Sequence, residues 1–259
     1  MMNGRIFRVM APVLFGVGVL LLWEVGVRGL DVSPAVLPAP SVIWAALIGA
    51  SHLLWSDFVQ TVGKGALAGL VIGALAGVGA ALLIDRSPFL RRGFLPIATF
   101  FAALPIVGMA PIMVMWFGFG WESKAAVVVA MVFFPMLVNT LAGLAATDQM
   151  QRDLMRTYSA SHLQTLRYLR LPVAMPFIFN GLKISTTLAL IGAIVAEYFG
   201  SPTQGLGFRI SIEVGRLGID MVWAAIAVAA LSGTLLYGLV ALIEARVTFW
   251  HPAQRTGRR

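Results

Sequence analysis

Cysteine is absent from this chain of 259 residues. The sequence therefore offers no disulfide, no thiolate metal ligand and no cysteine nucleophile. The three histidines, His52, His162 and His251, are far apart along the chain, and none belongs to an HExxH pattern, the helical motif of many zinc enzymes. We therefore expect no metal site in this chain.

Charged residues are also scarce. They make up 12% of the sequence, whereas hydrophobic residues make up 59% and the mean hydropathy is +0.88. Ordinary globular domains are about 25% charged. Because a water-soluble fold could not bury so much apolar surface, the composition excludes a soluble enzyme and a disordered protein. The chain is expected to lie in a bilayer. Its net charge of +8 does not predict a nucleic-acid partner, because the arginines fall in short clusters between apolar runs.

Six apolar segments are long enough to cross a bilayer, which takes roughly 20 residues. They cover about residues 9–27, 62–84, 94–117, 123–146, 176–198 and 221–244. Pro105 and Pro111 should break the third of them, since proline interrupts a helix. The sequence thus predicts an all-α, polytopic membrane protein with about six transmembrane helices.

Basic residues are distributed unequally between the two sides of this predicted bundle. If the N-terminus is cytoplasmic, 13 of the 19 Lys and Arg residues lie on the cytoplasmic side, and Lys64 and Lys183 lie within spans. The remaining four lie on the outer side: Arg28, Lys124, Arg209 and Arg216. Cytoplasmic loops carry an excess of Lys and Arg, so both termini are predicted to be cytoplasmic.

Two connections on the outer side are predicted to be loops. Residues 29–41 are rich in proline, and residues 199–219 are rich in glycine. Residues 42–55 are apolar but shorter than a span. The sequence leaves open whether they form a surface helix or part of a span.

Four glycines recur at four-residue intervals in the second predicted span: Gly65, Gly69, Gly73 and Gly77. Positions four apart lie on one helical face, and the missing side chains let another helix approach closely. We interpret this face as a helix-packing seam.

The neighbouring Lys64 does not belong to a phosphate-binding loop. The pattern G-x-x-x-x-G-K-[ST] would need glycine at position 58 and a hydroxyl at position 65, but Phe58 and Gly65 stand there. We therefore expect no ATP site of this kind in the chain.

Lys183 and Glu197 are the charged residues of the fifth predicted span, and intramembrane charges are candidates for a pathway or gate. They lie roughly 21 Å apart along a helix, too far to pair. Lys183 could reach the headgroups or face the bundle. Asn139, Asn180 and residues 185–187 (Ser-Thr-Thr) are predicted to form interhelical hydrogen bonds.

The most informative stretch is the cytoplasmic connection at residues 147–175, which is long for a helical bundle. Its apolar residues recur at spacings of three and four, which favours amphipathic helix. Residues 159–161 (Ser-Ala-Ser) interrupt this pattern, Ser161 is a candidate N-cap for a second short helix, and Pro172 should end it. Such a corner suits either a docking element for a soluble partner or a helix on the membrane surface.

This connection resembles the EAA loop of permease subunits of binding-protein-dependent ABC importers, whose pattern is E-A-A-x3-G-x9-I-x-L-P. Here Asp153-Leu154-Met155 is followed by Ser159 in the glycine position, Leu169 in the isoleucine position, and Leu171-Pro172. The spacing and the L-P ending are kept, whereas Asp replaces Glu, Leu-Met replaces Ala-Ala and Ser replaces Gly. Residues 191–200 (IGAIVAEYFG) and 205–207 (GLG) resemble the branch that imports nitrate, sulfonates, taurine or pyrimidine-type vitamin precursors.

The resemblance implies a type I ABC importer permease fold in the inner membrane, with residues 1–259 as one domain that contains a coupling loop at about 147–172. Two copies of this subunit would form the channel within the lipid, two ATP-binding subunits would hold ATP and Mg, and an extracytoplasmic binding protein would deliver the solute. The chain itself would then be a transport subunit without cofactor or ATPase site. The implied coupling residues are Asp153, Tyr158, Ser159, Ala160, Ser161, Leu169, Leu171 and Pro172.

Two other classes of function fit less well. A secondary transporter driven by an ion gradient would need carboxylates near the membrane midplane, but Glu24, Glu197 and Glu244 lie near the ends of predicted spans. An intramembrane enzyme would need a catalytic pair at membrane depth, and no Ser–His or Asp–Asp pair is evident. The substrate does not follow from the sequence.

Overall fold

The structure is a computed structural model that describes residues 4–102, 105–200 and 203–250, and every regular element in these ranges is a helix. In chain order the first elements are α1 (Gly4–Gly29), α2 (Pro40–Gly49), α3 (Ser51–Phe58), the π-helix η1 (Val59–Ala66), α4 (Leu67–Asp85), α5 (Pro88–Ala102) and α6 (Ile106–Phe117). The others are α7 (Trp121–Ala145), α8 (Gln149–Thr157), α9 (His162–Thr165), the π-helix η2 (Leu166–Arg170), α10 (Leu171–Gly200), α11 (Leu206–Gly215) and α12 (Ile219–Val247).

Five helical stretches of this described part are long and apolar enough to cross a membrane: Met10–Gly29, Ser51–Asp85, Trp121–Ala145, His162–Gly200 and Ile219–Val247. They confirm five of the predicted spans. Two are longer than predicted, because α3, η1 and α4 form one continuous helix, and α9, η2 and α10 form another.

The segment 94–117, counted as one predicted span, is not a single helix, and the break predicted at Pro105 is confirmed. The segment is divided between α5 and α6, and Pro105 caps the start of α6 with extended backbone. Proline has no N–H to donate, and its ring crowds the preceding turn, so it is tolerated at a helix start better than inside one. Pro111, the other proline expected to break the segment, is accommodated within α6.

The loop predicted at residues 29–41 is confirmed at residues 30–39, which lie between α1 and α2 and are not helical. The segment 42–55, whose structure the sequence left open, is helical apart from a turn at Ala50. Residues 42–55 are divided between α2, which packs against α12, and α3, which begins the long helix that continues into α4. The glycine-rich 199–219 connection contains a helix of its own, α11. Short apolar helices with neighbours to cover them are therefore ordered even though they are too short to span a bilayer.

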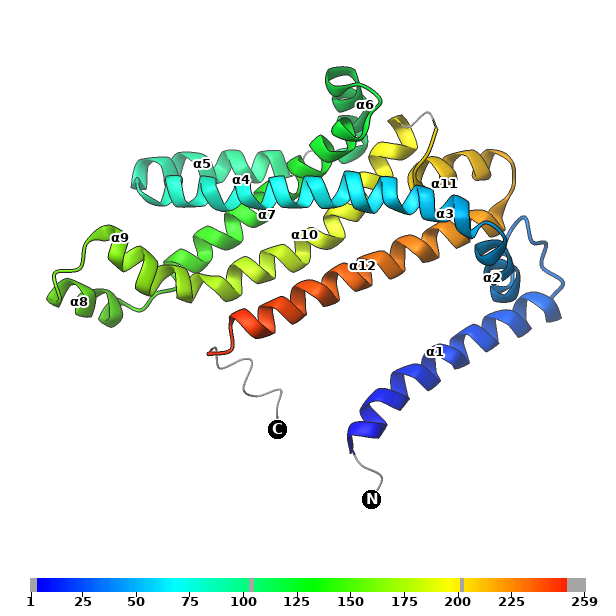
Figure 1. The fold of residues 1–259 in the computed structure, drawn as a ribbon, viewed down its shortest axis with the longest axis horizontal. Helices are drawn as coiled ribbons and strands as arrows, with labels where there is room; N and C mark the ends of the chain where they lie inside the picture. Colours follow the sequence, from blue (N-terminus) through cyan, green and yellow to red (C-terminus); the bar gives the residue numbers. More distant parts are fainter. Residues whose placement is uncertain (1–3, 103–104, 201–202, 251–259) are drawn as a thin grey trace.

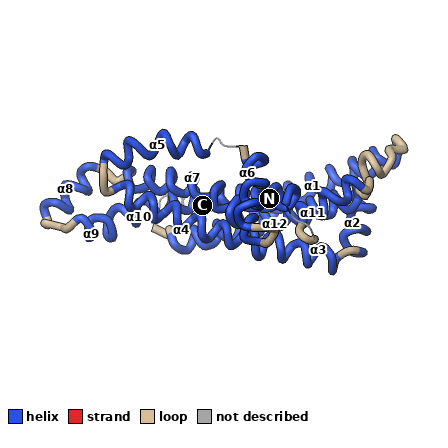
Figure 2. The backbone as a smooth tube through the Cα atoms, turned by 90° about the horizontal axis from the view of Figure 1, so that it is seen from above, coloured by secondary structure: helices blue, strands red, loops and turns tan. Residues whose placement is uncertain are grey.

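The long helices α4, α7, α10 and α12 run side by side, whereas α1 stands apart from α12 along most of its length (Figure 1). Near its C-terminal end α1 is attached by Trp23, whose ring packs edge-to-face on Trp223 at a centroid distance of 5.1 Å. Figures 1 and 2 place α8 and α9 at one end of the elongated molecule, which we call the loop end. The end that carries α2, α3 and α11 is called the opposite end.

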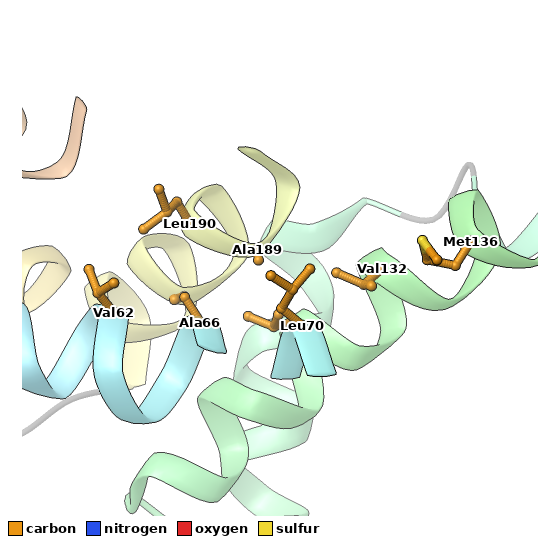
Figure 3. Packing of buried hydrophobic residues seen from close by; sticks show 9 residues of the cluster. Val62, Ala66, Leu70, Val132, Met136, Ala189 and Leu190 are labelled. Carbon is orange, nitrogen blue, oxygen red and sulfur yellow. The ribbon is translucent and has the colours of Figure 1, made fainter. Parts of the chain in front are cut away.

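The central core is formed where η1 and α4, α7 and α10 meet (Figure 3). Its buried residues are small or β-branched for the most part: Val62, Ala66, Leu70, Val128, Val132, Met136, Ala189, Leu190 and Ala193. Small side chains let backbones approach, which is how helices gain packing contacts within lipid.

The glycine face of the second span lies against α7. A Cβ added at Gly69 would lie 2.8 Å from the carbonyl oxygen of Ala125, and one at Gly77 would lie 2.7 Å from that of Phe133. Gly73 is similarly close to Val132, whereas a Cβ at Gly65 would make ordinary contacts of 3.5 Å or more. Three of the four glycines therefore occupy positions where any side chain would push α4 away from α7.

Candidate functional site: the loop end and a buried ionic cluster

The loop end is formed by two short helices joined at a sharp corner. The α8 helix runs from Gln149 to Thr157 and has no buried residue. It closes with a backbone bond from the N–H of Ser159 to the oxygen of Arg156 at 2.8 Å. The next helix starts at Ser161, whose hydroxyl accepts from the N–H of Gln164 while the Gln164 side chain accepts from the N–H of Ser161. This capping box confirms the N-cap predicted at Ser161.

Ser159 sits at the corner with φ of +52°. This left-handed conformation favours glycine, which has no Cβ to crowd the following carbonyl. The geometry gives a physical reason for the glycine at this position of the pattern that the sequence resembles. Serine keeps the corner small, and its neighbours Tyr158 and Ser161 are exposed.

The outer face of α8 carries a stripe of exposed apolar side chains. Met150, Leu154 and Tyr158 are 79%, 55% and 76% exposed and follow one another at four-residue spacing, so they lie on one face of the helix. Asp153 beside them makes a 3.1 Å ion pair with Arg156, and both side chains are exposed. The loop end therefore presents an apolar stripe with charges at its edge.

Two arginines bind this loop to the ends of the spans through hydrogen bonds. Arg152 of α8 donates to the carbonyl oxygens of Ala145 and Thr147 just beyond α7. Arg170 of η2 donates to the carboxylate of Asp85 and to the carbonyl oxygen of Leu144. The loop is thus held to the bundle at both of its ends.

The helical pattern does not end at Pro172 as the sequence predicted. The helix continues from His162 to Gly200, and the stretch just before Pro172 is the π-helix η2. A wider π turn is one way to accommodate a proline, whose ring crowds the carbonyl four residues earlier. Pro172 and Leu169 line a cavity of about 540 Å³ together with Tyr168 and Trp250. Leu171 opens α10.

At the opposite end, ionic and hydroxyl groups are buried together. The side chains of Asp57, Thr61, Lys124 and Glu197 are at most 1% exposed, and Arg209 is 9% exposed. We call these five residues the ionic cluster. They come from the continuous helix of α3 and η1 and from α7, α10 and α11, so this cluster joins segments from three separate regions of the sequence.

Nearly every polar group of the cluster is paired. Asp57 accepts from Nε of Arg209 at 2.8 Å and from the backbone N–H of Gly205 at 2.8 Å. The Thr61 hydroxyl donates to Oε2 of Glu197 at 2.7 Å and accepts from the N–H of Leu206. Burying charge is unfavourable unless it is paired and hydrogen-bonded, so removing one member of this network should destabilise the others; Oε1 of Glu197 is the one buried side-chain atom of the cluster without a partner among the described residues.

Backbone groups near residue 200 complete the network. Glu197 also accepts from the N–H of Gly207 at 3.0 Å, and the ammonium of Lys124 donates to the carbonyl oxygens of Gly200 and Phe119. Gly205 has φ of +124°, a conformation open to glycine and hardly to other residues. The G-L-G sequence at 205–207 therefore lets the chain fold closely over Glu197.

The sequence interpretation missed most of this cluster. Lys124 and Arg209 were expected to be basic residues of outer loops, and Asp57 and Thr61 were not singled out. The available signal was weak: charged residues with apolar neighbours near the ends of spans. Glu197, the candidate pathway residue, is a member of this cluster, and its role in a pathway or gate stays a prediction.

Lys183 lies elsewhere, within the bundle. Its ammonium makes a 2.7 Å ion pair with Glu244 of α12, and both side chains are largely buried. The prediction of interhelical hydrogen bonds for Asn139 and Asn180 is confirmed, because Asn180 of α10 donates to Asn139 of α7 at 3.3 Å. The prediction for residues 185–187 is wrong for Thr186, whose hydroxyl donates to the carbonyl oxygen of Lys183 within its own helix.

The sequence matches a family described as the binding-protein-dependent transport system inner membrane component over residues 69–249. It is 30% identical to the formylaminopyrimidine transport permease protein ThiX of Halalkalibacterium halodurans over 96% of this chain and 99% of that protein. It is also 30% identical to the taurine transport system permease protein TauC of Escherichia coli, covering 88% of this chain and 85% of that protein. In structure it resembles a chain of an amino acid ABC transporter crystallised with histidines, with a TM-score of 0.65 and 18% identity over 78% of this chain and 97% of that chain.

Proposed function

Because the chain belongs to the family of binding-protein-dependent transport system inner membrane components, we propose that two copies of it form the channel of an importer driven by ATP. The hydrolysis takes place on two copies of a separate ATP-binding subunit, which hold ATP and Mg. An extracytoplasmic binding protein delivers the solute at the opposite end. In this arrangement the loop end and both termini are cytoplasmic.

The exposed corner at the loop end is the observation that carries this proposal. The α8 helix lies at the tip of the molecule (Figure 1) and carries the exposed apolar side chains of Met150, Leu154 and Tyr158. The small residues 159–161 leave room for a partner surface. Aromatic and Met side chains are enriched in protein interfaces. The corner is fastened to the span ends by Arg152 and Arg170, so a partner that moves it also moves the bundle.

The solute is proposed to be a small sulfonate such as taurine, nitrate, or a pyrimidine-type precursor. The support for this range is the pair of relatives that are named for taurine and formylaminopyrimidine transport. Lipid surrounds the spans, and nothing in this proposal calls on nucleic acid.

An ion-gradient-driven transporter remains the alternative, and the charges of the bundle disfavour it. A coupling ion needs a carboxylate that can take up and release it near the middle of the membrane. Glu197 is bound by Thr61 and by the backbone of Gly207 at the opposite end, and Glu244 is paired with Lys183.

Purification of the chain from its native membrane in mild detergent tests the proposal. Native mass measurement should show two copies of this chain with two copies of a nucleotide-binding subunit, and the complex should hydrolyse ATP with inhibition by vanadate. A purified chain that carries no ATP-hydrolysing partner, and transports in response to an ion gradient, would reject the proposal.

A further inference from the structure

Arg170 lies at the junction between the loop end and the long span α10. Its guanidinium makes a two-pronged ion pair with Asp85, from Nη1 to Oδ2 at 2.7 Å and from Nη2 to Oδ1 at 2.8 Å. The same side chain donates from Nε and Nη2 to the carbonyl oxygen of Leu144 at 3.2 and 3.0 Å. The Arg170 and Asp85 side chains are 14% and 6% exposed, so water competes little for these bonds.

Both partners of Arg170 are helix C-terminal groups that need a cation. Asp85 is the last residue of α4, where the partial negative charge of the helix end disfavours a carboxylate. The carbonyl of Leu144 lies in the last turn of α7, where carbonyl groups lack partners within the helix. Only an arginine presents enough donors in one plane to satisfy both at once, because a lysine ammonium is a single point of charge.

These two helix ends belong to one packed unit. The α4 and α7 helices meet along the glycine seam, where Gly69, Gly73 and Gly77 leave no space for side chains. A displacement applied to their shared C-terminal ends is therefore transmitted along both helices together, since close-packed helices do not slide past each other without losing these contacts.

The segment that carries Arg170 is a break in the regular α-helical hydrogen bonding. Residues 166–170 are π-helical, and they connect the capped start of α9 to α10. π-helical turns in α-helices are frequent at functional sites. Without the bonds of Arg170, this turn could absorb a movement of α8 and α9 locally and leave the spans where they are.

We propose that Arg170 is the positioning residue that transmits movement of the 147–172 loop to α4 and α7. The inference rests on the proposed function, in which an ATP-binding subunit moves this loop. It assigns the transmission to the bonds with Asp85 and Leu144, and not to the covalent continuity of the loop with α10.

The absence of cysteine allows a direct test with one spin label per chain. Gln149→Cys places the label on α8 outside the stripe of Met150, Leu154 and Tyr158, and Leu75→Cys places it on α4, both at exposed positions. In the complex with the ATP-binding subunit, pulsed electron resonance measures the distance between the two copies of each label, before and after trapping with ATP, Mg and vanadate. In the otherwise unaltered protein we expect both distances to change on trapping.

Arg170→Lys should keep the change at α8 and lose more than half of the change at α4. Asp85→Asn should also reduce the distance change at α4. It keeps the bonds from Arg170 to Leu144, so it serves as a second test if Arg170→Lys does not assemble with the ATP-binding subunit. Arg167→Lys is the matched control, since Arg167 lies in the same π-helix with its side chain exposed and over the ring of Tyr168. It should leave both distance changes intact. Each variant should have the same thermal unfolding midpoint and the same complex mass as the otherwise unaltered protein, which would show that each one still folds and assembles.

Three results would count against the inference. A full α4 change in both Arg170→Lys and Asp85→Asn would show that the loop acts through another connection. If trapping changed the α8 distance but not the α4 distance in the otherwise unaltered protein, the inference would be overturned and the proposed function would stand. An unresponsive α8 label in the unaltered protein would instead contradict the proposed function itself.

Discussion

Ser159→Arg is expected to leave the membrane chain folded but to detach it from the ATP-binding subunit. Ser159 is exposed at a corner with φ of +52°, where a partner surface can approach closely because Ser159 and the two residues after it, Ala160 and Ser161, are small. A long charged side chain there blocks this approach. A loss of about 2.8 kcal/mol of docking free energy would weaken the association by roughly a hundredfold. Co-purification and ATP hydrolysis by the complex measure the effect.

Ser159→Gly is the matched control for this substitution. Glycine adopts the left-handed conformation without strain, so this variant should keep the complex and its activity. Asp153→Ala should also be mild, because its ion pair with Arg156 is exposed and exposed pairs contribute little. Normal co-purification of Ser159→Arg would show that the corner is not part of the docking surface.

Asp57→Ala should destabilise the opposite end by about 3–5 kcal/mol, the usual effect of removing one partner of a buried ion pair. Arg209 would keep its charge in a site where only 9% of the residue is exposed, and the N–H of Gly205 would lose its acceptor. Combining Asp57→Leu with Arg209→Met should recover most of the loss, because apolar residues of similar volume can replace a buried pair. The thermal unfolding midpoint of the chain in detergent measures both changes.

The pair between the exposed Arg216 and the largely buried Glu213 provides the comparison for this prediction. Its side chains are 3.5 Å apart, and that of Arg216 is 68% exposed, so Arg216→Ala should change stability by less than about 1 kcal/mol. If Asp57→Ala lowered the unfolding midpoint as little as Arg216→Ala, the bonds between Asp57 of α3 and Arg209 of α11 would not stabilise the opposite end.

Features that depend on neighbouring residues could be read from the sequence. The N-cap predicted at Ser161 bonds to Gln164 only three positions later, and the glycine seam repeats every four residues. Both follow from helix geometry alone. The small residues at 159–161 likewise predicted the corner, and the conformation of Ser159 fits the glycine of the resembled pattern.

Features that depend on long-range pairing could not be predicted. Asp57 and Arg209 are 152 residues apart in the sequence, and Asp85 and Arg170 are 85 residues apart. Hydrophobic periodicity indicates which segments are helices, but not which charged residue meets which across the bundle. Lys124 is an example: its position at the start of a predicted span indicates a charge on the outer side, but in the structure it is buried and its ammonium donates to the carbonyl oxygen of Gly200.

The central claim is that the loop end docks on an ATP-binding subunit, and site-specific crosslinking tests it most directly. A single cysteine replaces Tyr158 at the loop end or Leu217 at the opposite end, two positions that are 76% and 69% exposed. The purified complex is then treated with a short maleimide-to-amine crosslinker. We predict an adduct with the ATP-binding subunit from Tyr158→Cys and none from Leu217→Cys. An adduct from Leu217→Cys alone would contradict the account.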